Sequence, residues 1–125
     1  MTRIVALFWV AAAVLSCNDV AGGCIDDSRL PAFDLEIRDS VTSAPIAETA
    51  VATVLNGPFV DSLPLCEQTS GGVWLSRCGP DERAGTYDIL VIHPNHQSWS
   101  VHGVFVPHDA CHVQTVRLQI RMQQR

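Results

Sequence analysis

Phe33-Asp-Leu-Glu-Ile-Arg38 carries the clearest structural pattern in this chain. Apolar and charged side chains alternate along it without exception. Because successive side chains of a β-strand point to opposite faces, the stretch predicts a strand with one face against a core and one in water. The same pattern returns in Val116-Arg-Leu-Gln-Ile-Arg-Met122, near the end of the chain. Residues Val116, Leu118, Ile120 and Met122 are expected to point inward there.

Further strand regions lie between these two stretches. They are rich in Val, Ile and Thr and are separated by residues typical of turns, and they cover 46–55, 73–75, 87–92 and 99–106. The region 87–92 is apolar on both faces, which indicates a central strand. No segment after residue 16 keeps the 3.6-residue apolar period of a helix. We therefore expect an all-β fold, a single antiparallel β-sandwich of about seven strands over residues 31–123.

Two local features follow from these patterns. Asn56-Gly57 predicts a tight turn at the end of the second strand region. In the region 99–106, strict alternation places His102 on the same face as Ser100, Val104 and Val106.

The first sixteen residues have the layout of a secretory signal peptide. Arg3 supplies a positive charge, residues 4–15 form an apolar run, and Ser16 is the small residue before a cleavage site. As a helix this run would span about 18 Å, which is short of the roughly 30 Å hydrocarbon core of a bilayer. We expect residues 1–16 to be removed during secretion. A permanent transmembrane helix is the alternative.

Cys17 is the expected site of a lipid anchor. Val14-Leu-Ser-Cys17 resembles the lipobox of bacterial lipoproteins, which implies cleavage before Cys17 and acylation of the cysteine, for example with palmitate. Several acyl chains on one residue anchor a protein firmly, whereas a single chain binds only marginally. Residues 17–30 would then form a tether to the membrane. Cleavage by an ordinary signal peptidase is the alternative, because Val14 and Ser16 also satisfy its preference for small residues.

The remaining four cysteines are expected to form two disulfides. They are Cys24, Cys66, Cys78 and Cys111, an even number in an oxidising compartment, and they allow three pairings. We favour Cys66–Cys111, which leaves Cys24–Cys78, with the other pairings open. No Cys-x-x-Cys motif is present, which disfavours zinc binding and thioredoxin-like chemistry.

Residues 32–122 resemble the carboxypeptidase regulatory-like domain, a β-sandwich of the transthyretin (prealbumin) type. The resemblance rests on four stretches in order, which are 35–46 with its Pro-Ile pair, 50–57, 83–91 with its Gly-x-Tyr motif, and 93–99. The ending, 109–118, resembles that of small bacterial lipoproteins of this group. The resemblance implies a module for folding or interaction beside other activities. In the motif, Gly85 permits a turn, and Tyr87 is expected to bury its ring while its hydroxyl reaches a backbone partner.

Five histidines late in the chain are the best candidates for chemistry. They are His93, His96, His102, His108 and His112, and their spacing does not show that they converge as metal ligands must. We therefore predict no metal site and no cofactor. No Gly-x-Ser-x-Gly motif occurs, and Tyr87 is the only tyrosine, which excludes an iron site with two tyrosine ligands as in intradiol dioxygenases. We expect no enzymatic activity.

The function expected from the sequence is that of a non-enzymatic lipoprotein of the cell envelope. It would be held at a membrane on the extracytoplasmic side, in the periplasm or at the cell surface, and would present a β-sandwich to an envelope protein. A net charge of −5 disfavours nucleic acid as a partner. The alternative is a carbohydrate- or metal-binding module that uses Trp99 and the late histidines, with Trp74 beside Trp99 in a stacking platform.

Overall fold

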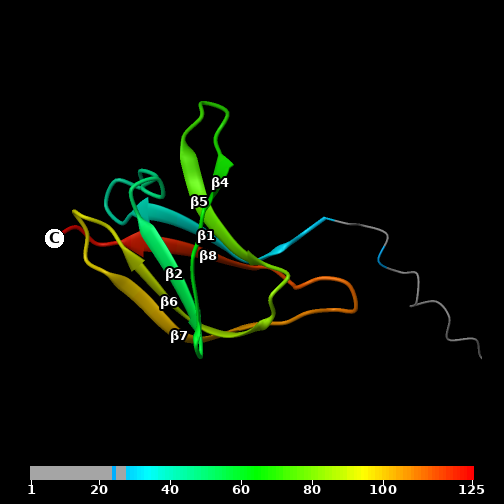
Figure 1. Ribbon diagram of the computed structural model, residues 1–125. Coiled ribbons are helices and arrows are strands. Elements are labelled where there is room, and N and C mark those ends of the chain that lie inside the picture. The colour runs from blue at the N-terminus through cyan, green and yellow to red at the C-terminus, as the bar shows by residue number, and fades with distance from the viewer. Residues whose placement is uncertain (1–23, 25–27) are drawn as a thin grey trace, which may run out of the picture.

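The computed structural model describes Cys24 and residues 28–125, so Cys17 and the expected signal peptide lie outside the described residues. The described part is all-β, as expected (Figure 1). Its eight strands are β1 (Pro31–Asp39), β2 (Val51–Asn56), β3 (Phe59–Ser62), β4 (Leu65–Gln68), β5 (Trp74–Asp81), β6 (Gly85–Ile92), β7 (Trp99–Val106) and β8 (Val116–Met122). Within these described ranges, no helix is long and apolar enough to cross a membrane.

The strands form two four-stranded sheets that pack face to face, so the predicted β-sandwich is confirmed. One sheet has the order β4-β5-β1-β8 and the other the order β3-β2-β6-β7. All pairs are antiparallel except β1 and β8, which are parallel. The exception arises because the loop 107–115 crosses between the sheets at the end where β1 begins. β8 therefore starts beside the start of β1, with Val116 opposite Phe33.

The core lies between the inner faces of the two sheets. On β1, Phe33, Leu35 and Ile37 are fully buried, as the alternation predicts. They meet Tyr87, Ile89 and Val91 of β6, which is a central strand as expected. The inward residues of β8 differ in burial: Ile120 and Met122 are buried, whereas Val116 and Leu118 are only partly buried. Each fully buried side chain of this size contributes about 1.5–3 kcal/mol through the hydrophobic effect.

Tyr87 fixes the start of β6 in the way the sequence predicts. Its ring is fully buried edge-on against Phe33, with the centroids 5.2 Å apart, and its hydroxyl donates a hydrogen bond of 2.8 Å to the carbonyl of Arg83. Gly85 between them has a φ of 144°, and a Cβ there would lie 3.2 Å from the side chain of Asn56. Glycine is therefore needed for both the conformation and the close approach.

A β-bulge in β7 overturns the predicted face of His102. Val104 lies opposite Tyr87 and Val101 lies opposite Ile89, so both His102 and Gly103 face the single residue Asp88. Gly103 takes a φ of 71°, and its N–H donates a 3.0 Å hydrogen bond to the Asp88 carboxylate. The extra residue reverses the alternation. Ser100 and His102 consequently point to solvent, while Val104 and Val106 point to the core.

Two short strands were not expected. β3 follows the predicted Asn56-Gly57 turn and pairs with β2, with Phe59 opposite Asn56. β4 and a much longer β5 occupy the irregular region after it, and their hairpin projects beyond the sandwich (Figure 1). The region is rich in proline and glycine, and strands of four residues are too short to establish an alternation.

The disulfides are Cys24–Cys111 and Cys66–Cys78, so the favoured pairing of Cys66 with Cys111 and Cys24 with Cys78 is wrong. Cys66 and Cys78 lie on the adjacent strands β4 and β5, with their Cα atoms 5.7 Å apart. Cys111 belongs to the loop that leads into β8, at the opposite edge of this sheet. Strands are about 4.8 Å apart, and a disulfide cannot join Cα atoms more than about 7 Å apart, so Cys66 and Cys111 are out of reach.

Candidate functional site

The structure brings two of the five late histidines together in a buried hydrogen-bond network. We call Asp39, Thr49, His93, His96 and Gln124 the histidine network. Thr49 Oγ1 lies 2.6 Å from His93 Nε2, and the Nδ1 atoms of His93 and His96 are 2.8 Å apart. His96 Nε2 then lies 2.6 Å from Asp39 Oδ2, which also accepts a 2.8 Å hydrogen bond from Gln124.

Local sequence explains how these groups meet. Asp39 ends β1, and its Oδ1 accepts hydrogen bonds from the N–H groups of Val41 and Thr42, which leaves Oδ2 free for His96. His93 follows β6, and the turn through Pro94 folds His96 back so that its N–H donates to the carbonyl of His93. The two imidazole rings stand almost perpendicular, with centroids 4.5 Å apart.

Burial and hydrogen bonding set the charges in this network. Asp39, His93 and His96 are each no more than 6% exposed. The N–H of Thr42, then Gln124 and His96, hold the pKa of the Asp39 carboxyl well below its usual range. Burial, and then the proximity of His96, lower the pKa of His93. Asp39 is therefore ionised, and the His96 nitrogen facing it carries a proton.

The histidine network connects three segments that are distant in sequence. Asp39 is the last residue of β1 and Thr49 lies in the β1–β2 connection. His93 and His96 belong to the β6–β7 connection, and Gln124 to the C-terminal segment. Arg125 adds a 2.9 Å hydrogen bond from its Nε to the carbonyl of His96. The arrangement closes one end of the sandwich, which we call the histidine end.

The other end of the sandwich carries a second histidine–carboxylate pair. His112 Nδ1 lies 2.7 Å from Glu82 Oε1, and Glu82 also accepts hydrogen bonds from the N–H groups of Leu30 and Val113. The N–H of Leu30, followed by His112, lowers the pKa of Glu82. This end includes the Cys24–Cys111 disulfide, and we call it the cystine end.

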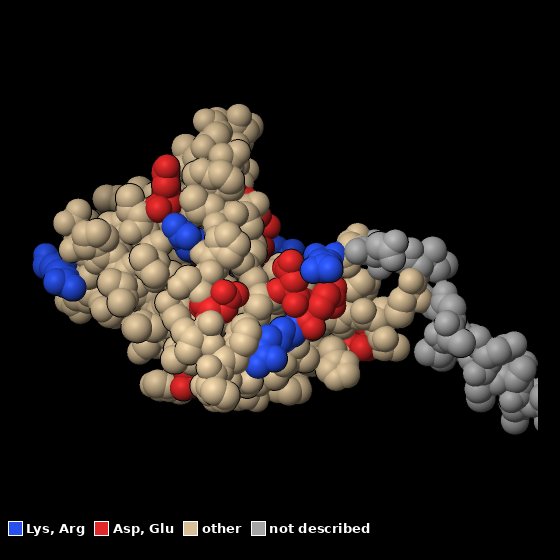
Figure 2. Space-filling view, in the orientation of Figure 1, with Lys and Arg blue, Asp and Glu red and all other residues tan. Residues whose placement is uncertain are grey.

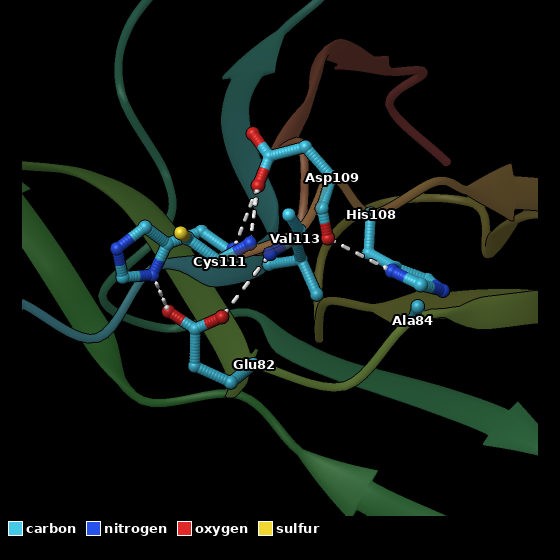
Figure 3. Close-up of a pocket in the computed structure, with 8 residues that line it drawn as sticks. Glu82, Ala84, His108, Asp109, Cys111 and Val113 are labelled. Carbon is cyan, nitrogen blue, oxygen red and sulfur yellow. Dashed lines mark hydrogen bonds and ion pairs between the residues drawn. The ribbon is translucent and has the colours of Figure 1, made fainter. Parts of the chain in front are cut away.

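An open pocket of about 330 Å³ lies at the cystine end (Figure 3). Asp109 shapes it, because its carboxylate accepts hydrogen bonds of 2.8 Å from the N–H groups of Cys111 and His112. His108 lies to one side of the loop, away from Glu82, and its Nδ1 is 3.0 Å from the carbonyl of Asp109. His102 is separate again, on β7 beside Asp88.

The late histidines therefore do not converge on one point. Among Cys24 and residues 28–125, one group of three potential ligands brings its atoms within 4.8 Å of one another, and it consists of Asp34, Cys66 and Cys78. The two cysteines are joined in a disulfide, so they offer no thiolate to a metal.

The two described tryptophans lie in different sheets and do not form one platform. Trp74 is in β5, whereas Trp99 is in β7. Trp99 packs against the core and lines an open pocket of about 230 Å³. The other lining residues are Gln97, Ser98, Arg121, Met122 and Gln123.

Asp34 is a buried residue that the sequence did not single out. The alternation correctly places it on the outer face of β1, where a solvated carboxylate is expected, yet Asp34 is only 6% exposed. No signal in the sequence reveals this burial, because it depends on which strands flank β1. No model of a known protein family matches the chain, and no curated protein matches it at a significant level.

Proposed function

We propose that this protein is a non-enzymatic lipoprotein of the cell envelope, anchored through Cys17, that presents its β-sandwich to an envelope protein. The observation that carries the proposal is the Cys24–Cys111 disulfide. It ties the chain to the cystine end seven residues after Cys17. The disulfides also indicate an oxidising, extracytoplasmic environment.

The disulfide shortens the tether. Without it, the whole stretch 17–30 would separate the lipid from β1. With the disulfide, only residues 17–24 separate the lipid from the cystine end. A chain of that length reaches at most about 25 Å. The cystine end would therefore face the membrane closely, and the histidine end would point away from it.

The surface away from the tether suits contact with a protein. Figure 2 shows that uncharged side chains cover most of the visible face, with the densest group of charges toward the end where β1 begins. The outer face of the sheet β3-β2-β6-β7 exposes apolar side chains, including Val51 and Ile92, which are paired across β2 and β6. We expect the envelope partner to contact this face.

The resemblance to the carboxypeptidase regulatory-like domain belongs to the same proposal. The two-sheet architecture supports it, as does the Gly-x-Tyr motif at the start of a central strand with its buried Tyr87. The resemblance implies both the two-sheet architecture and the buried tyrosine of this motif.

Metabolic labelling with palmitate tests the anchor. We expect label in the wild type and none in Cys17→Ser. Cys24→Ser is the matched control, because it removes a cysteine of the same segment and leaves the lipidation site, so it should keep its label. Equal label in the wild type and in Cys17→Ser would overturn the anchor.

A carbohydrate site at Trp99 is the second candidate. The pocket beside Trp99 combines an aromatic ring with Arg121 and the amides of Gln97 and Gln123, groups that can stack on a sugar and bond its hydroxyls. Tryptophan fluorescence titrated with glycans tests it. A shift that is lost in Trp99→Phe and kept in Trp74→Phe would support the site, and no shift with any glycan would dismiss it.

A further inference from the structure

The two disulfides are alike in exposure and differ in what surrounds them. Each joins one exposed cysteine, Cys66 or Cys24, to a partly buried one, Cys78 or Cys111. A carboxylate oxygen of Asp34 lies within 4.8 Å of both sulfur atoms of Cys66–Cys78. In the described part of the chain, no histidine, aspartate or glutamate lies that close to both sulfurs of Cys24–Cys111.

Strand register places Asp34 beside this disulfide. On the outer face of β1, Asp34 lies directly opposite Cys78 of β5 on one side and Arg117 of β8 on the other. Arg117 donates a 2.7 Å hydrogen bond to Asp34 Oδ2 and also lies 3.6 Å from Glu67 Oε1. Arg117 thus holds Asp34 in place, and the carboxylate is largely buried, with a small part of its surface still open to solvent.

The surroundings favour the protonated form of Asp34. Burial, and then the adjacent carboxyl of Glu67, raise its pKa, while Arg117 acts in the opposite direction with a smaller effect. A carboxyl whose pKa is raised keeps its proton to a higher pH and in that form can act as a general acid. A separation below 4.8 Å is short enough for a single water molecule to carry the proton from the carboxyl to the sulfur.

We propose that Cys66–Cys78 is a thiol–disulfide exchange site for a dithiol of an envelope protein, with Asp34 as the group that protonates the departing sulfur. The dithiol, as a thiolate, attacks the exposed Sγ of Cys66. The Cys66–Cys78 bond breaks, its electron pair moves to Cys78 Sγ, and that sulfur takes the proton of Asp34. Asp34 is reprotonated from solvent.

A second step completes the exchange. The other thiol of the dithiol, after losing its proton to solvent, attacks the mixed disulfide and releases Cys66, which takes a proton. The dithiol is then a disulfide, and Cys66 and Cys78 are both thiols, so two electrons and two protons have moved. The site requires only the oxidised sandwich and does not depend on the lipid anchor.

The test compares the two disulfides in the same molecules. The oxidised protein is exposed briefly to dithiothreitol between pH 5 and pH 8, quenched with acid, alkylated and digested, and each cysteine is quantified by mass spectrometry. We expect Cys66–Cys78 to be reduced faster than Cys24–Cys111. In Asp34→Asn its rate should fall about tenfold, less than the roughly 10²–10⁴ typical of general acid catalysis, because a thiolate leaves readily without a proton.

Two further variants separate this role from a structural one. Glu67→Gln removes the neighbour that raises the Asp34 pKa, so the pH profile of Cys66–Cys78 reduction should move to lower pH. Asp88→Asn, on the other sheet, is the matched control and should change neither rate. Equal rates for the two disulfides, or an Asp34→Asn variant that slows both equally, would overturn the proposal, and so would a pH profile that Glu67→Gln leaves in place.

Discussion

The two ends of the sandwich carry the same kind of pair in different surroundings. At the histidine end, His96 lies 2.6 Å from Asp39, and the two side chains are 7% and 5% exposed. At the cystine end, His112 lies 2.7 Å from Glu82, and the two side chains are 19% and 30% exposed. The distances are nearly equal, so burial decides the difference. A buried charge left without its partner is costly, whereas an exposed pair contributes little.

The ends also differ in how they are closed. The histidine end is held by hydrogen bonds between three segments of the chain, and the cystine end by the covalent bond Cys24–Cys111. Reduction should therefore loosen one end, and acid the other.

The largest expected effect is the loss of the covalent closure. In Cys24→Ser/Cys111→Ser, the unfolded chain is freed from a cross-link that spans 87 residues, and stability should fall by about 4 kcal/mol. Urea unfolding of the non-reduced protein measures this. In this variant dithiothreitol can reduce only Cys66–Cys78, so it should lower the stability less than it does in the wild type. A loss under about 1 kcal/mol would mean that the cross-link does not constrain the domain.

The next largest effect is expected at the histidine end. His96→Ala leaves the buried Asp39 carboxylate without its closest partner, so stability should fall by about 3 kcal/mol. His112→Ala is the matched variant at the cystine end and should cost less than about 1 kcal/mol. Chemical denaturation of both variants provides the comparison. Equal losses would show that burial does not separate the two ends.

A buried hydrogen bond at the cystine end should give an intermediate effect. Tyr87→Phe removes the hydroxyl that bonds the carbonyl of Arg83 and keeps the ring in the core. The expected cost is about 1–1.5 kcal/mol, between those of His96→Ala and His112→Ala. Thermal unfolding followed by circular dichroism checks it. A Tyr87→Phe variant as stable as the wild type would show that water replaces the lost bond.

The smallest expected effect is a dependence on pH. Burial lowers the pKa of His93, so the unfolded chain binds a proton near pH 6.5 that the folded protein does not. This contribution to stability should therefore be fully present well above pH 6.5 and decline as the pH falls through 6.5 toward the lowered pKa of the folded protein. Because Asp39 also has a lowered pKa, a further loss should follow below pH 4.

The urea midpoint at each pH measures this dependence. His93→Gln should flatten the decline between pH 7 and pH 5, and His108→Gln, an exposed control, should not. A wild type that gains stability over this range on acidification would contradict the assignment.

Regular alternation made much of the fold predictable. It indicated β1 and the bounds of β7, while apolar residues on both faces indicated the central place of β6 and the Asn-Gly pair indicated the turn at Asn56-Gly57. It failed at His102, because one inserted residue reverses the two faces of a strand. The short strands β3 and β4 were not predicted, because four residues are too few to show an alternation of apolar and polar side chains.

The site was less predictable, because it depends on contacts between distant strands. The spacing of His93 and His96 placed both at one turn, but nothing in the sequence joined them to Asp39, 57 residues from His96. The Cys66–Cys78 pairing and the burial of Asp34 both follow from the order β4-β5-β1-β8. That order is set by packing of the two sheets and not by any local motif.

The intact mass of the protein, purified from membranes without reduction, would show both the anchor and the disulfides. We expect the mass of a chain that begins at Cys17 and carries acyl chains, four hydrogens lighter than the fully reduced form, as two disulfides require. Reduction should raise this mass by four hydrogens and leave the acyl chains in place. A mature chain that begins at another residue, or one that begins at Cys17 without lipid, would contradict the anchored lipoprotein.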